Sequence, residues 1–172
     1  AVKGTITPSA CAPLISGDGT IDFGKMSAKD LNADQHTKLP NQSMLLSVRC
    51  EAPTLFTLNT VDNRAGSSAN HDNWHGLGMT PEGEKLGGSA FHLYTPIADG
   101  APVQTITSRD GGVTWELTNM LNHTLVTAVA RGNDLVPIAV RALDAEIRLY
   151  THIAPADGLT LTGKGEPGAT VV

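Results

Sequence analysis

The chain has 172 residues, enough for one domain with a substantial buried core, and we interpret residues 1–172 as a single domain. Its 12 Lys and Arg residues against 17 Asp and Glu residues give a net charge of −5, and without a basic stripe this argues against nucleic acid as a partner. No apolar run approaches the ~20 residues of a membrane-spanning helix. Charged residues are only 17%, and 18 glycines and 10 prolines predict many turns, so the composition favours an all-β fold.

Short runs with strand-like alternation recur along the chain and are separated by Gly, Pro and Asp. We expect extended segments over residues 2–7, 20–26, 43–50, 54–61, 91–95, 103–107, 113–117, 124–130, 143–153 and 159–162. Residues 27–41 are mostly polar and are expected to form a connection, with one helical turn capped by Ser27 as an alternative. Eight or more short strands with such turns between them predict a β-sandwich.

Three of these segments carry informative patterns. The alternation in 43–50 places one set of side chains on a single face, namely Met44, Leu46, Val48 and Cys50. The alternation in 143–153 is the most regular, and it places on one face Leu143, Ala145, Ile147, Leu149, Thr151 and Ile153. The run 54–61 is almost uninterrupted, which predicts a central strand with both faces covered. The irregular stretch 62–84 is expected to be a long loop or a lid over one end of the fold.

Two cysteines, Cys11 and Cys50, lie in or beside strand-like runs that end at proline. A pair in such positions favours a disulfide, and closing a loop of roughly 40 residues would add about 4 kcal/mol of stability. Such a bridge would place the chain outside a reducing cytosol. The alternative is that both are free, buried cysteines that pack as small apolar side chains.

The segment 108–115 fits the pattern S-x-D-x-G-x-T-W and resembles the Asp-box turn of sialidases and related propellers. Its pattern residues are Ser108, Asp110, Gly112, Thr114 and Trp115. The aspartate can accept backbone N–H groups across the turn, glycine supplies a positive φ, and tryptophan can pack beneath the hairpin. We interpret the segment as a structural turn, because a propeller would need about twice this length.

No catalytic constellation emerges, so we predict that the chain is not an enzyme and needs no cofactor. His71 and His75 are spaced as zinc ligands on a helix would be, with His92 further on, but their surroundings favour a surface loop over a metal site. The chain has no G-x-S-x-G elbow and no glycine-rich phosphate loop. A hydrolase that uses scattered His and Asp residues is the least favoured interpretation.

Several segments, in this order along the chain, resemble a bacterial family of fimbrial-type proteins encoded with chaperone–usher pilus assembly systems. They are TITPSAC at 5–11, IDFG at 21–24, LSVRCEAP at 46–53, DNRA at 62–65, GLG at 76–78, the Asp-box segment, and PADGL at 155–159. The resemblance implies an immunoglobulin-like, pilin-type β-sandwich that lacks its final strand, with Cys11 and Cys50 joining its first two strands. An unpaired sheet edge above an apolar groove needs a covering chain. We expect the groove wall at the inward face of 143–153 or at the late apolar strands near it.

The implied partners are a periplasmic pilus chaperone, an outer-membrane usher and neighbouring subunits that add a strand. The implied location is the periplasm in transit and then the cell surface. Family members carry a donor extension before the first cysteine, whereas here only Val2 and Ile6 could act as plugs, which suggests a capping subunit or a trimmed extension. Residues 165–172 begin like the family's last strand but include no aromatic residue. The alternative function is a secreted carbohydrate-binding module or tip adhesin that binds a glycan through Trp74, His71 and His75.

Overall fold

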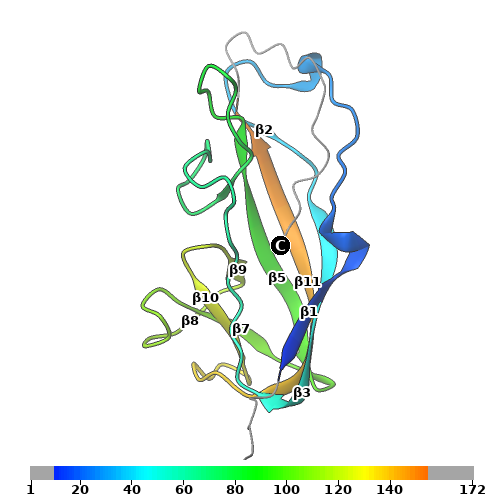
Figure 1. The fold of residues 1–172 in the computed structure, drawn as a ribbon, viewed down its shortest axis with the longest axis vertical. Coiled ribbons are helices and arrows are strands. Elements are labelled where there is room, and N and C mark those ends of the chain that lie inside the picture. Colours follow the sequence, from blue (N-terminus) through cyan, green and yellow to red (C-terminus); the bar gives the residue numbers. More distant parts are fainter. Residues whose placement is uncertain (1–9, 155–172) are drawn as a thin grey trace, which may run out of the picture.

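The computed structural model describes residues 10–154 and shows an all-β fold of two sheets (Figure 1). Among these residues, the helical content is limited to two short 3-10 turns. Within the described part of the chain, no helix is long and apolar enough to cross a membrane. The segments expected at 2–7, 159–162 and 165–172 lie outside the described residues.

The elements follow in chain order. They are β1 (Cys11–Ile15), η1 (Ser16–Gly19), η2 (Ala28–Asp30), β2 (Thr37–Lys38), β3 (Gln42–Thr54), β4 (His75–Gly76), β5 (Gly87–Ala98), β6 (Ala101–Pro102), β7 (Gln104–Ser108), β8 (Glu116–Leu117), β9 (Met120–Leu121), β10 (Val126–Ala130) and β11 (Val140–Ile153).

The long strand β11 is the centre of the larger sheet, whose order is β1-β3-β11-β5-β4. Outside this order, β2 pairs with β11, and β6 and β9 pair with β5. Strand β11 lies between β3 and β5 and is antiparallel to both (Figure 1). Every second side chain of β11 from Leu143 to Ile153 is buried, as the alternation predicted. The alternation predicted for β3 is confirmed as well, because Met44, Leu46, Val48 and Cys50 are buried.

The smaller sheet has the order β10-β7-β8 and covers part of the inner face of the larger one. One core cluster joins both sheets and includes Val129 of β10 with Val48 and Leu143 of the larger sheet. The other cluster is built around buried Phe91 and Ile147, and among the described residues none of its members comes from β7, β8 or β10. Coil and edge residues instead pack against this second cluster, namely Ile15, Ile21, Phe23 and Leu58.

A disulfide joins Cys11 to Cys50, so the predicted bridge is confirmed. The two cysteines are directly opposite each other in the antiparallel pair β1–β3. The disulfide therefore links the edge strand β1 covalently to its neighbour β3. At the other edge, Asp99 and Gly100 both have positive φ, 49° and 79°, and connect β5 to β6. This is the geometry that favours Asp-Gly in a two-residue hairpin.

Three extended segments expected from the sequence are corrected. Residues 55–61 are not a strand, because their only bridge within the described chain joins Leu58 to Thr127 of β10. Residues 20–26 form no strand either, although Ile21 and Phe23 pack against the core. The run 113–117 is reduced to β8, because the Asp-box turn takes up its first residues.

Candidate functional site

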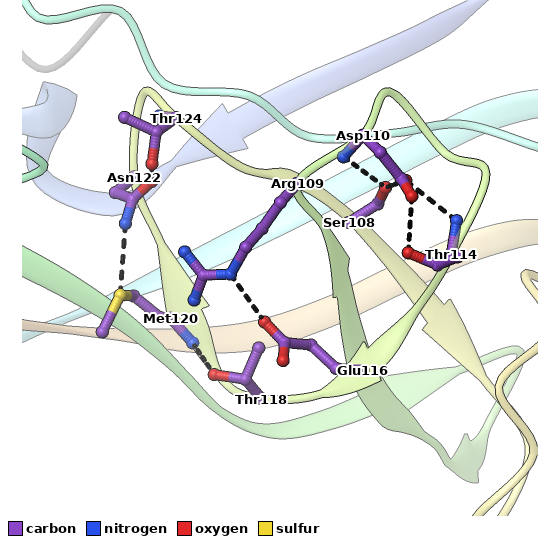
Figure 2. Close-up of polar contacts among 9 residues, drawn as sticks. All are labelled: Ser108, Arg109, Asp110, Thr114, Glu116, Thr118, Met120, Asn122 and Thr124. Carbon is purple, nitrogen blue, oxygen red and sulfur yellow. Dashed lines mark hydrogen bonds and ion pairs between the residues drawn. The ribbon is translucent and has the colours of Figure 1, made fainter.

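The Asp-box turn connects β7 to β8 and is organised by the carboxylate of Asp110 (Figure 2). Its Oδ1 accepts hydrogen bonds from the N–H groups of Val113 and Thr114, at 3.0 and 2.8 Å, and from the hydroxyl of Ser108 at 2.7 Å. Its Oδ2 accepts from the Thr114 hydroxyl at 2.6 Å. The Ser108 oxygen in turn accepts the N–H of Gly112 at 2.7 Å. The polar groups of Ser108, Asp110, Gly112 and Thr114 therefore bind one another.

The electrostatics of this turn also indicate a structural role. The hydrogen bond from the Thr114 hydroxyl, followed by those from the Thr114 N–H and the Ser108 hydroxyl, holds the pKa of Asp110 well below its usual value of 3.8. A carboxylate with so low a pKa is a poor general base near neutral pH. Gly112 has a φ of 96°, and Trp115 packs against Ile106, Ala128 and Ala130 beneath the hairpin. The arrangement is that of a structural turn.

An exposed ion pair lies beside the turn and connects its two flanking strands (Figure 2). Arg109 Nε is 3.1 Å from Glu116 Oε1, and the two side chains are 65% and 53% exposed. A pair this exposed contributes little stability, about 0–1 kcal/mol. Neither residue was singled out from the sequence.

The loop 62–84 does not bring its histidines together. His71 is exposed and lies edge-on to Trp74, with ring centroids 5.5 Å apart. His75 is buried on the inner side, 4.9 Å from Phe91 and 5.4 Å from His123. Within residues 10–154, no group of three or more His, Cys, Asp or Glu is arranged to hold a metal ion.

Sequence reasoning missed the residues that the structure places beside Trp74. His152 of β11 lies 5.0 Å from the Trp74 ring and 6.4 Å from the His36 ring. Burial, and then the positive charges of His36, Lys38 and His71, lower the pKa of His152. The alternation in 143–153 already predicted that His152 lies on the face opposite the core, but no sequence signal placed the loop against it.

The third candidate is segment 55–61, whose only pairing in the described part of the chain is at Leu58. Its side chains alternate between exposed and half-buried, and Leu55 and Val61 are 61% and 68% exposed. Leu58 donates its N–H to the carbonyl of Thr127 at 2.7 Å and accepts the N–H of Thr127 at 2.9 Å. Among residues 10–154, the N–H groups of Thr57 and Asn59 take part in no backbone hydrogen bond.

Comparison with known proteins gives a partial match. A family profile described as "Protein of unknown function (DUF1120)" matches residues 1–75. The chain is 30% identical to Protein GltF of Escherichia coli K12 over 115 residues, which is 54% of this chain and 45% of that protein. It is 24% identical to the uncharacterized protein YhcF of the same organism over 151 residues, which is 85% of this chain and 58% of that protein. The chain thus spans about half the length of these curated relatives, and no solved structure matches it.

Proposed function

We propose that this chain is an exported, non-enzymatic subunit of a chaperone–usher fimbria, in either a structural or a capping position. Its β-sandwich is immunoglobulin-like and is completed by a strand borrowed from another chain. The chaperone supplies that strand in the periplasm, and a neighbouring subunit replaces it after passage through the usher. The observation that carries the proposal is that segment 55–61 pairs with another segment only at Leu58 among residues 10–154.

The order of the strands supports an immunoglobulin-like arrangement. In that fold, one sheet has the order A-B-E-D, and strand C follows B and belongs to the opposite sheet. Here the larger sheet has the order β1-β3-β11-β5. Its strand β11 follows β5 in sequence but lies between β3 and β5, just as strand E follows D in sequence but lies between B and D. Segment 55–61 follows β3 directly and contacts the opposite sheet, as a strand C would. Its contact there, β10, precedes β11 in the chain, whereas the F strand that pairs with C in an immunoglobulin fold follows E.

The apolar surface next to this edge supports the need for an added strand. Leu58 is only partly buried, and it packs against two clusters, the one that joins both sheets and the one that has no member from β7, β8 or β10. A strand docked along 55–61 would bring alternating apolar side chains over the second of these clusters. It would also pair the N–H and C=O groups that the edge now presents.

The experiment titrates the purified chain with a peptide of alternating apolar residues that copies a pilin donor strand. Since the peptide binds only the folded form, the melting temperature should rise with its concentration, with about 2.7 kcal/mol of added stability at 100 times Kd. A peptide in which the alternating apolar residues are replaced by serine is the control. An unchanged melting temperature with the donor peptide would contradict the proposal.

A pair of variants tests the position of the added strand. Asn59→Pro removes the edge N–H and adds a ring that obstructs a neighbouring strand, so it should abolish the response to the peptide. Asn59→Ala keeps the N–H group and should respond as the parent chain does. Equal responses from both variants would show that the peptide binds elsewhere.

A further inference from the structure

The loop 62–84 contains a short tip, residues 70–74, that lies against the face of the larger sheet opposite the core. Just before the tip, Ala69 donates its N–H to the carbonyl of Gly87 at 3.2 Å, and just after it β4 pairs with β5. Within the described chain the tip itself belongs to no strand. It can therefore move between two fixed points without disturbing the pairing of the sheet.

One histidine of β11 makes the contacts that hold the tip. Nδ1 of His152 is 2.8 Å from Nδ2 of Asn70, at the start of the tip. The ring of His152 lies 5.0 Å from the ring of Trp74, at the end of the tip. Among residues 10–154, the bond to His152 is the only side-chain hydrogen bond that the tip makes. A single side chain thus joins both ends of the tip to the sheet.

A glycine beside this histidine lets the tip approach the sheet closely. Gly88 of β5 is the direct partner of His152 in the pair β5–β11. A Cβ atom at this position would be 2.7 Å from Oγ of Ser68 and 3.5 Å from Cε3 of Trp74. A larger residue would therefore displace the loop, and the contact between Trp74 and His152 depends on the absence of a side chain here.

Closure of the tip leaves polar atoms unsatisfied. Oγ of Ser68 and Oδ1 of Asn70 are buried and have no hydrogen-bond partner within the described chain. Burial of a polar atom without a partner is unfavourable, and opening of the tip would return both atoms to water. The contacts with His152 are therefore needed to keep the tip closed.

Basic side chains from three segments surround His152. Lys38 of β2 is its direct partner in the pair β2–β11. The ring of His36, in the connection before β2, is stacked on that of His152 with centroids 6.4 Å apart. His71 belongs to the tip itself and lies edge-on to Trp74. A proton on His152 would add a positive charge among these groups.

No ion pair offsets that charge. Within residues 10–154, neither His152 nor Asp72, the only carboxylate of the tip, takes part in a salt bridge, and Asp72 is exposed. Tyr150, the neighbouring outward residue of β11, is an uncharged phenol near neutral pH. Burial, and then the neighbouring positive charges, lower the pKa of His152. Opening of the tip removes much of this burial, so the open form binds a proton more readily.

Protonation also conflicts with the hydrogen bond to Asn70. In the closed tip the NH₂ group of Asn70 faces Nδ1 of His152, which accepts the bond and carries no hydrogen. A proton at Nδ1 would face this NH₂ group unless the amide turned over. Turning would put the NH₂ group in the buried position where Oδ1 has no partner within the described chain.

We propose that the tip 70–74 is a pH-sensitive lid, which is closed while His152 is neutral and opens when His152 takes up a proton. Opening frees Trp74 and uncovers the sheet at Gly88 and His152. Since one proton is taken up, the ratio of open to closed lids changes by at most about tenfold per pH unit. The inference is independent of strand addition, because none of these residues lies in segment 55–61.

The test measures how accessible Trp74 is to acrylamide, a quencher of tryptophan fluorescence, between pH 7.5 and 5. It uses the full chain with its disulfide intact, at a temperature at which far-UV circular dichroism shows the folded state at both pH values. The chain has two tryptophans, so the contribution of Trp115 is measured in Trp74→Phe and subtracted. The quenching constant of Trp74 should rise as the pH falls. A quenching constant that does not change with pH would overturn the proposal.

Three variants identify the group that controls the lid. His152→Gln cannot become charged, and its amide can still accept the NH₂ group of Asn70, so the lid should stay closed at pH 5. Asn70→Asp places a carboxylate beside the charged ring of His152 and should also keep the lid closed at pH 5. His92→Gln removes another outward histidine, which contacts Tyr150, and should open as the parent chain does. Opening of His152→Gln or Asn70→Asp to the extent of the parent chain would overturn the proposal, and so would loss of opening in His92→Gln.

Discussion

At the scale of single residues, Asp110 shows how a motif typical of an enzyme family can have a purely local role. Its carboxylate binds groups within four residues of itself, and these contacts lower its pKa without any distant charge. The sequence pattern was sufficient to predict this turn, because every group that the motif requires lies within it. When the hydrogen-bond partners of a motif come from distant segments, the sequence pattern alone is not sufficient to predict its structure.

His75 is the residue for which the structure predicts a pH dependence. Burial lowers its pKa below the usual 6.5, while Asp62 raises it by less and His123 lowers it further. The unfolded chain therefore takes up a proton first as the pH falls below 6.5. The free energy of unfolding should be greatest above pH 7 and should decrease from pH 7 towards pH 5.

His75→Gln should reduce this decrease, measured as the change in melting temperature between pH 7.5 and 5. Part of the decrease should remain, because the pKa of His152 is lowered too. Asn133→Ala changes an exposed turn residue without a titrating group and should leave the pH dependence as it is in the parent chain. If the melting temperature changes equally between pH 7.5 and 5 with and without His75, the assignment of this pH dependence to His75 is contradicted.

At the scale of elements, alternation predicted some strands well and a continuous apolar run predicted one badly. The face assigned to β11 is correct at every position from Leu143 to Ile153. Successive side chains of a strand point to opposite faces, so the sequence of that strand alone predicts which of them are buried. The run 54–61 was predicted to be a central strand, yet after Thr54, the last residue of β3, it pairs within the described chain only at Leu58. Strand pairing requires a neighbour, and no property of a single segment specifies whether that neighbour is present.

Packing of β11 gives a prediction at this scale. Leu143 is 0% exposed and belongs to the cluster that joins the two sheets. Leu143→Ala should therefore lower the free energy of unfolding by about 2–5 kcal/mol. Leu45→Ala, on the outer face of β3 where the residue is 51% exposed, should change it by about 0.5 kcal/mol or less. Urea denaturation measures both, and similar losses would show that the outer face of the sheet is buried in solution.

At the scale of the whole molecule, the all-β class and the disulfide were predictable, whereas the arrangement of the sheets was not. Composition and turn spacing identify many short strands, but they do not indicate that β11, the last described strand, inserts between β3 and β5. They also do not indicate a cavity of about 330 Å³ between β5 and β7, because the polar residues that line it are of types that are common in any turn or exposed strand. Long-range pairing creates both features.

The disulfide gives the prediction that belongs to this scale. It ties the edge strand β1 to β3 across a separation of 39 residues, and closing a loop of that size lowers the entropy of the unfolded chain. The variant with both Cys11→Ser and Cys50→Ser should lose about 4 kcal/mol of unfolding free energy in urea. Reduction of the parent chain with dithiothreitol should produce a similar loss and should have no effect on the double variant. A parent chain as stable reduced as oxidised would mean that contacts of β1 with β3, and not the covalent bond, hold this edge of the sheet.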